Sequence, residues 1–204
     1  MRRLPGTPTR AALLVAPTVL GMAICLAGCS GGDEDDEPGG DGERSASSAP
    51  TEPGIDTRVE VGQVVGNLPK RPARDVAADV AGVVDRWLDA AYVGGDYPRS
   101  KFGEAFPGFT KDAAELAARQ PGLMSNKAVA DRVDSVTAKR RVVQVDVLAP
   151  KGEAAGATAH VNLVIELSGK VERTDQIRGR VLLTRSKSGW RVFGFDIERG
   201  EVKG

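Results

Sequence analysis

The spacing of apolar residues changes once along the chain, and this change limits the possible folds more than any other feature. Between Arg74 and Tyr92 apolar side chains recur at steps of three and four, which predicts an amphipathic helix. From Val129 onward they alternate with polar residues, as in half-buried strands. A helical part followed by a strand part predicts an α+β domain, with its helices on one face of an antiparallel meander sheet.

Two shorter helices are expected after the long one. Pro98 suits the first turn of a helix that carries Phe102 and Phe106. Thr110 has the side chain of an N-cap for a further helix over residues 111–119. The predicted helical part therefore contains three helices.

The strand predictions begin with residues 55–68, an arm or short edge strand, and residues 58–72 form the entry arm of the domain. Residues 139–141 are a basic turn that is expected to close a hairpin between the first two strands of the meander. In the last strand apolar residues occupy both odd- and even-numbered positions and so would lie on both faces. Either Gly194 marks a β-bulge or the strand is covered on both faces. The five expected strands span 129–139, 142–148, 161–167, 177–185 and 190–199.

The start of the chain has the composition of a secretory leader. Arg2, Arg3 and Arg10 precede the apolar-leaning run of residues 11–27, and no acid occurs there. A retained transmembrane helix is the alternative, but it would need about 20 apolar residues without the interruption at Pro17.

The end of this leader, Leu26 to Cys29, resembles the lipobox of bacterial lipoproteins. The resemblance implies that residues 1–28 are a signal peptide and that Cys29 receives a diacylglyceryl group, with acyl chains such as palmitate. It also implies a lipid anchor on the extracytoplasmic face of the cell membrane. Cys25 lies inside the leader, so the mature chain would hold one cysteine and no intrachain disulfide. The Ala-, Gly-, Val- and Arg-rich composition indicates a GC-rich coding sequence, as in actinobacteria.

Residues 29–57 are expected to be a disordered acidic tether rich in Gly, Ser and Pro. Nine acids and one arginine lie between Ser30 and Thr57, with almost no apolar residue to bury. The run Asp33 to Glu37 lacks the alternating spacing of a calcium loop, so we interpret it as a spacer. The remainder, residues 58–204, has 24 basic and 19 acidic residues.

The basic excess of residues 58–204 has two interpretations, a solvated surface or contact with anionic lipid heads or wall polymers. Nucleic acid is not an expected partner of an exported protein. The residues concerned are Lys139, Arg140, Arg141, Arg178, Arg180 and Arg191.

The stretch "VVDRWLDAAYVGGDYP" and the terminal "GWRVFGFD" resemble the nuclear-transport-factor-2-like superfamily, over residues 74–199. The resemblance implies a cone in which a curved sheet wraps a pocket, as in ketosteroid isomerases. The catalytic acids of those isomerases find no match here. Residues that would line such a pocket, or fill it as ordinary core, are Trp87, Tyr92, Phe102, Phe106 and Trp190.

His160 is the only histidine, and it shares the polar face of its strand with Asn162 and Glu166. Asp146 lies on the polar face of the neighbouring predicted strand, so the two residues are candidates for a general-base dyad. Solvated surface residues are the simpler interpretation. The sequence contains no phosphate loop, and neither a metal site nor a cofactor is predicted.

Taken with the lipobox, these features predict a non-catalytic binding or accessory module of the cell envelope, with an envelope protein or an apolar ligand as its partner. The alternative is a small isomerase or hydrolase that uses the cone cavity. A purely structural partner of an envelope complex is a third hypothesis, and it predicts a filled cavity and an exposed apolar patch.

Overall fold

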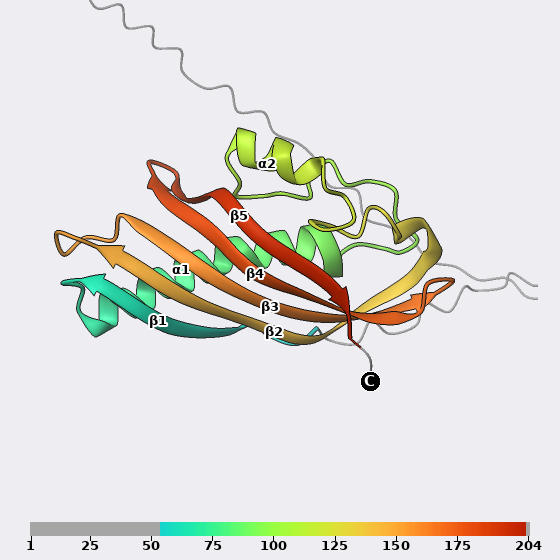
Figure 1. The fold of residues 1–204 in the computed structure, drawn as a ribbon, viewed down its shortest axis with the longest axis horizontal. Helices are drawn as coiled ribbons and strands as arrows, with labels where there is room; N and C mark the ends of the chain where they lie inside the picture. The colour runs from blue at the N-terminus through green and yellow to red at the C-terminus, as the bar shows by residue number, and fades with distance from the viewer. Residues whose placement is uncertain (1–53, 203–204) are drawn as a thin grey trace, which may run out of the picture. The chain divides into compact units, whose positions relative to one another are not determined.

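The computed structural model describes residues 54–202, which form a five-stranded sheet and two α-helices (Figure 1). The strands lie across the sheet in chain order: β1 (Arg58–Gly66), β2 (Val133–Ala149), β3 (Gly156–Gly169), β4 (Arg173–Ser186) and β5 (Gly189–Glu201). The helices are α1 (Lys70–Leu88) and α2 (Lys111–Ala118). The α+β class is confirmed.

The sheet is mixed and open, whereas a purely antiparallel meander was expected. β2 to β5 form the antiparallel meander, but β1 pairs with β2 in parallel. A parallel pair needs a long crossover, and residues 67–132, which include both helices, supply it. The expected edge strand within residues 55–68 is therefore confirmed, with a neighbour that its own sequence did not indicate.

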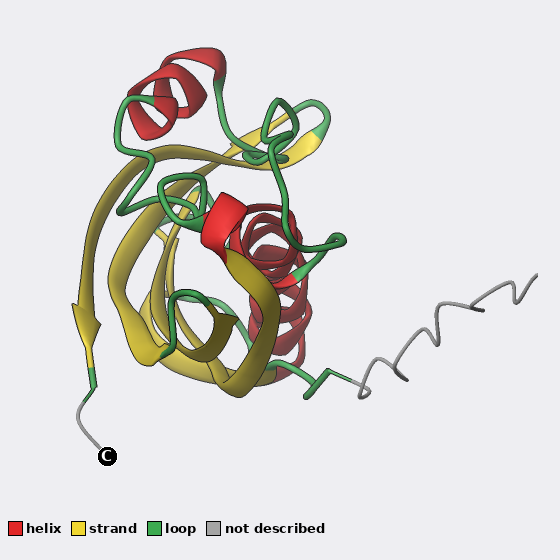
Figure 2. Ribbon diagram, turned by 90° about the vertical axis from the view of Figure 1, so that its right-hand side faces the viewer, coloured by secondary structure: helices red, strands yellow, loops and turns green. Residues whose placement is uncertain are grey.

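Helix α1 lies along the concave face of the sheet, which curves around it, and α2 lies beside β5 (Figure 2). The predicted apolar stripe is buried, from Val76 through Val84 to Leu88. The helix begins four residues earlier than predicted because Pro72 is tolerated in a first turn, where backbone N–H groups have no intrahelical partner. It ends in a π-helical turn, Asp89–Val93, and the glycine with positive φ after this turn is Gly95.

The helix expected from Pro98 is absent, and residues 94–110 form turns instead. A helix there would be short and would contain Gly103, so it would be marginal without strong packing. Arg99 instead donates hydrogen bonds to the carbonyls of Ala90 and Gly94, both at 2.7 Å. The helix after Thr110 is confirmed, and the Thr110 hydroxyl accepts the N–H of Ala113 at 3.4 Å.

The predicted hairpin at residues 139–141 is wrong, because β2 is one strand of 17 residues that pairs with β3 along its length. Lys139 instead lies in a β-bulge, where the pairing shifts between Ala138 and Arg140. The bulge reverses the alternation, so both Ala138 and Arg141 are buried. The three-residue basic stretch also lacks the glycine or asparagine that favours a tight hairpin turn.

A second bulge lies in β5, as the sequence allowed near Gly194. Leu182 pairs with Gly194 and Leu183 with Val192, so Phe193 has no partner across the ladder. Trp190, Val192 and Ile197 are buried on the same side as a result, and Phe193 is exposed. The two apolar faces suggested by the sequence are therefore one face with an interruption.

The hydrophobic core and all five strands come from residues 54–202. The described part therefore has the properties of an independently folding domain. Helix α1 and the other helices of this part are too short or too polar to cross a membrane.

Candidate binding surface

The space between α1 and the sheet is filled by the residues that were candidates for a pocket lining. Trp87 and Tyr92 are fully buried, and Trp190 is buried as well. Phe102 and Phe106 pack against the same cluster from the turns after α1. This side of the domain is a core built around aromatic rings, with Trp87 packed 5.8 Å from Tyr92 and 5.7 Å from Phe109, centroid to centroid.

Two aromatic side chains of this core bind backbone carbonyls, whereas the Trp190 indole N–H has no hydrogen-bond partner among the described residues. The Trp87 indole N–H donates to the carbonyl of Met124 at 3.3 Å, and the Tyr92 hydroxyl donates to the carbonyl of Leu123 at 2.6 Å. Burial raises the pKa of Tyr92 well above its usual value. A tyrosine that is fully buried and bound to a backbone carbonyl has the environment of a structural group.

His160 and Asp146 do meet on the opposite, outer face of the sheet, as their strand faces predicted. His160 Nε2 lies 2.8 Å from Asp146 Oδ2. The pair is open to solvent, since about two-fifths of the His160 side chain is exposed (42%). Gln144 and Arg180 flank His160 in the ladder, and neither is a nucleophile.

Asp146 has a second partner that explains its position. Its Oδ1 accepts the backbone N–H of Gln63 at 2.7 Å, at the β-bulge in β1. Burial alone would raise the pKa of Asp146, but the hydrogen bonds with Gln63 and His160 and the charge interaction with His160 lower it overall. A Cβ on Gly62 would lie only 2.1 Å from Asp146 Oδ1, so the glycine makes this approach possible. Asp146 therefore holds the bulge and His160 together.

Beside this pair lies an open depression of about 430 Å³, which we call the outer groove. It crosses the outer face from β1 to β5, near the ends where the β1–α1, β2–β3 and β4–β5 connections lie (Figure 1). Its exposed apolar side chains are Val65, Leu148, Leu182 and Phe193. Val65 and Phe193 are more than half exposed, at 59% and 53%. Four apolar side chains gathered on one face make the outer groove a candidate contact surface.

Both of the most exposed groove residues owe their direction to a bulge. The bulge at Gly62 and Gln63 turns Val64 inward and Val65 outward. The bulge in β5 leaves Phe193 facing outward. The outer groove was not predicted from the sequence. The available signal was two apolar residues in succession at each bulge, Val64 with Val65 and Val192 with Phe193.

Most of the basic residues expected to form a cationic surface are paired instead. Arg178 binds Glu198 at 3.1 Å, Arg180 binds Asp196 at 2.8 Å and Lys139 binds Glu166 at 2.7 Å. Arg191 donates to the carbonyl of Phe109 at 2.6 Å. The cations in the middle of the outer face are therefore mostly paired, although Arg140 is exposed and has no ion pair with a carboxylate of the described residues.

Arg141 is not on the surface at all, and its place in the basic group is corrected. The bulge at Lys139 turns it toward α1, where it donates to Asp89 at 2.7 Å and also binds Asp85. Its Nε donates to the Thr57 hydroxyl at 3.1 Å. This buried cation joins β2 to α1 and to the segment before β1, so its role is structural.

Cys29, the predicted lipidation site, and most of the predicted tether lie outside the described residues. Within residues 54–202 no three His, Cys, Asp or Glu side chains gather as metal ligands would. Comparison of the chain with protein-family models, with curated proteins and with solved structures finds no match.

Proposed function

We propose that this protein is an extracytoplasmic lipoprotein, anchored to the cell membrane through Cys29, whose domain acts as a non-catalytic binding or accessory module of the envelope. The observation that supports this proposal is the combination of a filled core with an exposed outer groove. An enzyme of the cone type would need ionisable groups converging in a cavity. Here most buried side chains on the concave side are aromatic or aliphatic, and the groove lies on the outer face. The two buried charged residues of the described part are held in ion pairs, Arg141 with Asp85 and Asp89, and Asp175 with Arg173 and Arg199.

We also propose that the α+β fold of this domain is a nuclear-transport-factor-2-like cone. The long helix against a strongly curved sheet supports it, as does the order of elements from α1 to β5. If the fold is this cone, the pockets of other members of the superfamily are the reference against which the filled core of this chain should be compared.

The anchor is tested by metabolic labelling with a fatty-acid precursor. The native chain incorporates the label and is cleaved before Cys29, and Cys29→Ser abolishes both. Label on the Cys29→Ser variant would contradict the lipobox interpretation.

The binding module is tested by replacing Phe193 with a photo-crosslinking residue. The matched control places the same residue at Leu116 on α2, which is also half exposed. Adducts specific to Phe193 support binding at the groove.

One observation favours a second candidate, a small hydrolase or isomerase. The His160–Asp146 pair has the 2.8 Å geometry of a base and its orienting carboxylate, and it borders the groove. Turnover of an ester or ketosteroid substrate that disappears in a folded His160→Ala variant would establish this candidate and displace the binding module.

A further inference from the structure

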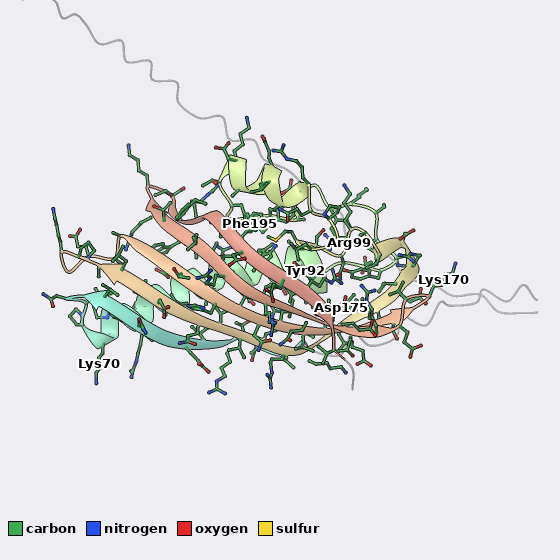
Figure 3. All side chains as sticks on the ribbon, viewed as in Figure 1. Lys70, Tyr92, Arg99, Lys170, Asp175 and Phe195 are labelled. Carbon is green, nitrogen blue, oxygen red and sulfur yellow. The ribbon has the colours of Figure 1, made fainter. Side chains whose placement is uncertain are left out.

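One end of the domain carries an unbalanced positive charge. The β1–α1, β2–β3 and β4–β5 connections, with the residues next to them, hold seven cations and two carboxylates. They come together at the left end in Figure 1, and Figure 3 labels Lys70 there. We call this surface the basic end. Its cations are Lys70, Arg71, Arg74, Lys151, Arg185, Lys187 and Arg191, and its carboxylates are Asp75 and Glu153.

The three connections form one surface. A Cβ on Gly152, in the β2–β3 connection, would lie 3.3 Å from the carbonyl oxygen of Asn67, in the β1–α1 connection. Gly156 and Thr184 pair in the ladder, which brings the β4–β5 connection next to the β2–β3 connection. The seven cations therefore act on the same region of solvent.

Six of these seven cations are exposed, and the charge is not neutralised within the described part. Lys70, Arg71, Lys151 and Lys187 make no ion pair with any carboxylate of residues 54–202. The N-terminus of α1 adds to the field, since its first turn has no acid and Pro69 provides no side-chain cap. The opposite end of the domain, where Figure 3 labels Lys170, has mixed charges.

The outer groove opens directly beside the basic end. Val65 lies one residue before the end of β1, and Leu148 lies one residue before the end of β2. Leu182 lies four residues before the end of β4, and Phe193 lies four residues after the start of β5. Asp146 borders the groove, but its carboxylate is bound by His160 and by Gln63. Exposed apolar side chains next to unpaired cations are the composition of surfaces that bind anionic membranes.

We infer that the basic end and the outer groove together form a docking surface for an anionic phospholipid bilayer. The cations bind lipid headgroups, and Phe193, Leu182, Leu148 and Val65 enter the headgroup and acyl boundary. This inference deepens the proposed function, on which it rests for the presence of a membrane. The domain would lie against the bilayer rather than extend away from it.

The chain geometry allows this contact while Cys29 is anchored. β1 carries the chain from Arg58, which pairs with Val142 in the middle of β2, toward the basic end. The nine residues of β1 span about 30 Å, and the residues from Cys29 to Pro53 can extend to about 85 Å. The tether is therefore long enough for the domain to turn its basic end to the membrane.

The test uses residues 54–204, which lack the leader and Cys29, so that binding cannot come from the lipid anchor. Flotation with vesicles of one-third phosphatidylglycerol in phosphatidylcholine is compared with flotation with phosphatidylcholine alone. We expect binding to the anionic vesicles, weakened by salt. The double variant Lys70→Gln and Arg71→Gln should lose about 25-fold in partition coefficient, since each cation near an anionic surface contributes about fivefold. Phe193→Ser should lose roughly tenfold.

Matched controls use equivalent changes away from the docking surface. The double variant Lys127→Gln and Lys170→Gln and the single variant Leu116→Ser should each remain within about twofold of the native domain, since neither touches the surface. Circular dichroism establishes that every variant is folded. Equal binding to both vesicle types, or equal losses in the controls, would overturn the inference.

Two further outcomes separate the lipid from other occupants. If the domain binds neither type of vesicle but a protein crosslinks at Phe193 in cells, the occupant of the surface is a protein. The bilayer inference is then wrong, and the proposed function still holds. If it binds soluble polyphosphate equally well with and without Phe193→Ser, the basic end recognises a wall polymer. The Cys29→Ser labelling experiment is independent of all three results, so failure of the anchor is recognised separately.

Discussion

Truncation of Trp87 to alanine tests whether the concave side of the sheet is core or pocket. The side chain is fully buried and contacts the rings of Tyr92 and Phe109. Its indole N–H also satisfies the carbonyl of Met124. Removing a large aromatic residue from a packed core costs about 3 to 5 kcal/mol of unfolding free energy. Loss of two aromatic contacts and one hydrogen bond places the expected value near the upper limit, about 5 kcal/mol.

The assay is equilibrium urea denaturation of residues 54–204, with unfolding monitored by circular dichroism. A loss of about 5 kcal/mol corresponds to a fall of roughly 10 to 20 °C in melting temperature for a domain of this size. Leu116→Ala is the matched control, because its side chain is half exposed on α2 and its loss should stay within about 0.5 kcal/mol. A Trp87→Ala loss below about 1.5 kcal/mol would refute the packed-core argument, since a residue lining an open pocket leaves no new cavity.

Two other substitutions and one deletion test the remaining assignments. His160→Ala should leave unfolding free energy within about 0.5 kcal/mol, because the pair is open to solvent; a loss above about 2 kcal/mol would contradict this. Asp146→Asn should destabilise the domain at neutral pH. Because the folded pKa of Asp146 is depressed, its contribution is present above the unfolded value of 3.8 and is lost as pH falls through the folded value. Native and variant stabilities measured by urea titration should therefore converge in acid, and a constant difference would count against the assignment. Deleting residues 31–48 from the mature chain should leave the melting temperature nearly unchanged, whereas a fall of several degrees would show that the acidic segment docks on the domain.

The sequence predicted those elements whose pattern is local and uninterrupted. The stripe from Val76 to Leu88 has helical spacing throughout, so α1 was predicted apart from its first turn. The His160–Asp146 pair was predicted because both residues lie on polar faces of adjacent strands. Alternation specifies faces well as long as nothing shifts its phase.

Bulges and non-local pairing account for most of what the sequence did not predict. A bulge inserts one residue and reverses the alternation, so the bulge at Lys139 resembled a turn between two strands. The parallel partner of β1 lies more than sixty residues away, and no local pattern specifies such a pairing. The outer groove depends on both kinds of feature, since Val65 lies on the parallel strand and Phe193 lies in a bulge.

The features that create the docking surface also lower the stability of the domain. Lys70 and Arg71 lie at the positive end of the α1 dipole, where each costs about 0.3 to 1 kcal/mol and where acids would be favourable. Phe193 and Val65 are turned into water by bulges, although a bulge-free strand would allow apolar residues to alternate into the core. Residues that lower the stability of a domain are concentrated at functional surfaces, because selection for function retains them only there. Four such residues meet at one end of this domain, and they carry the charge and the apolar groups that an anionic bilayer would bind.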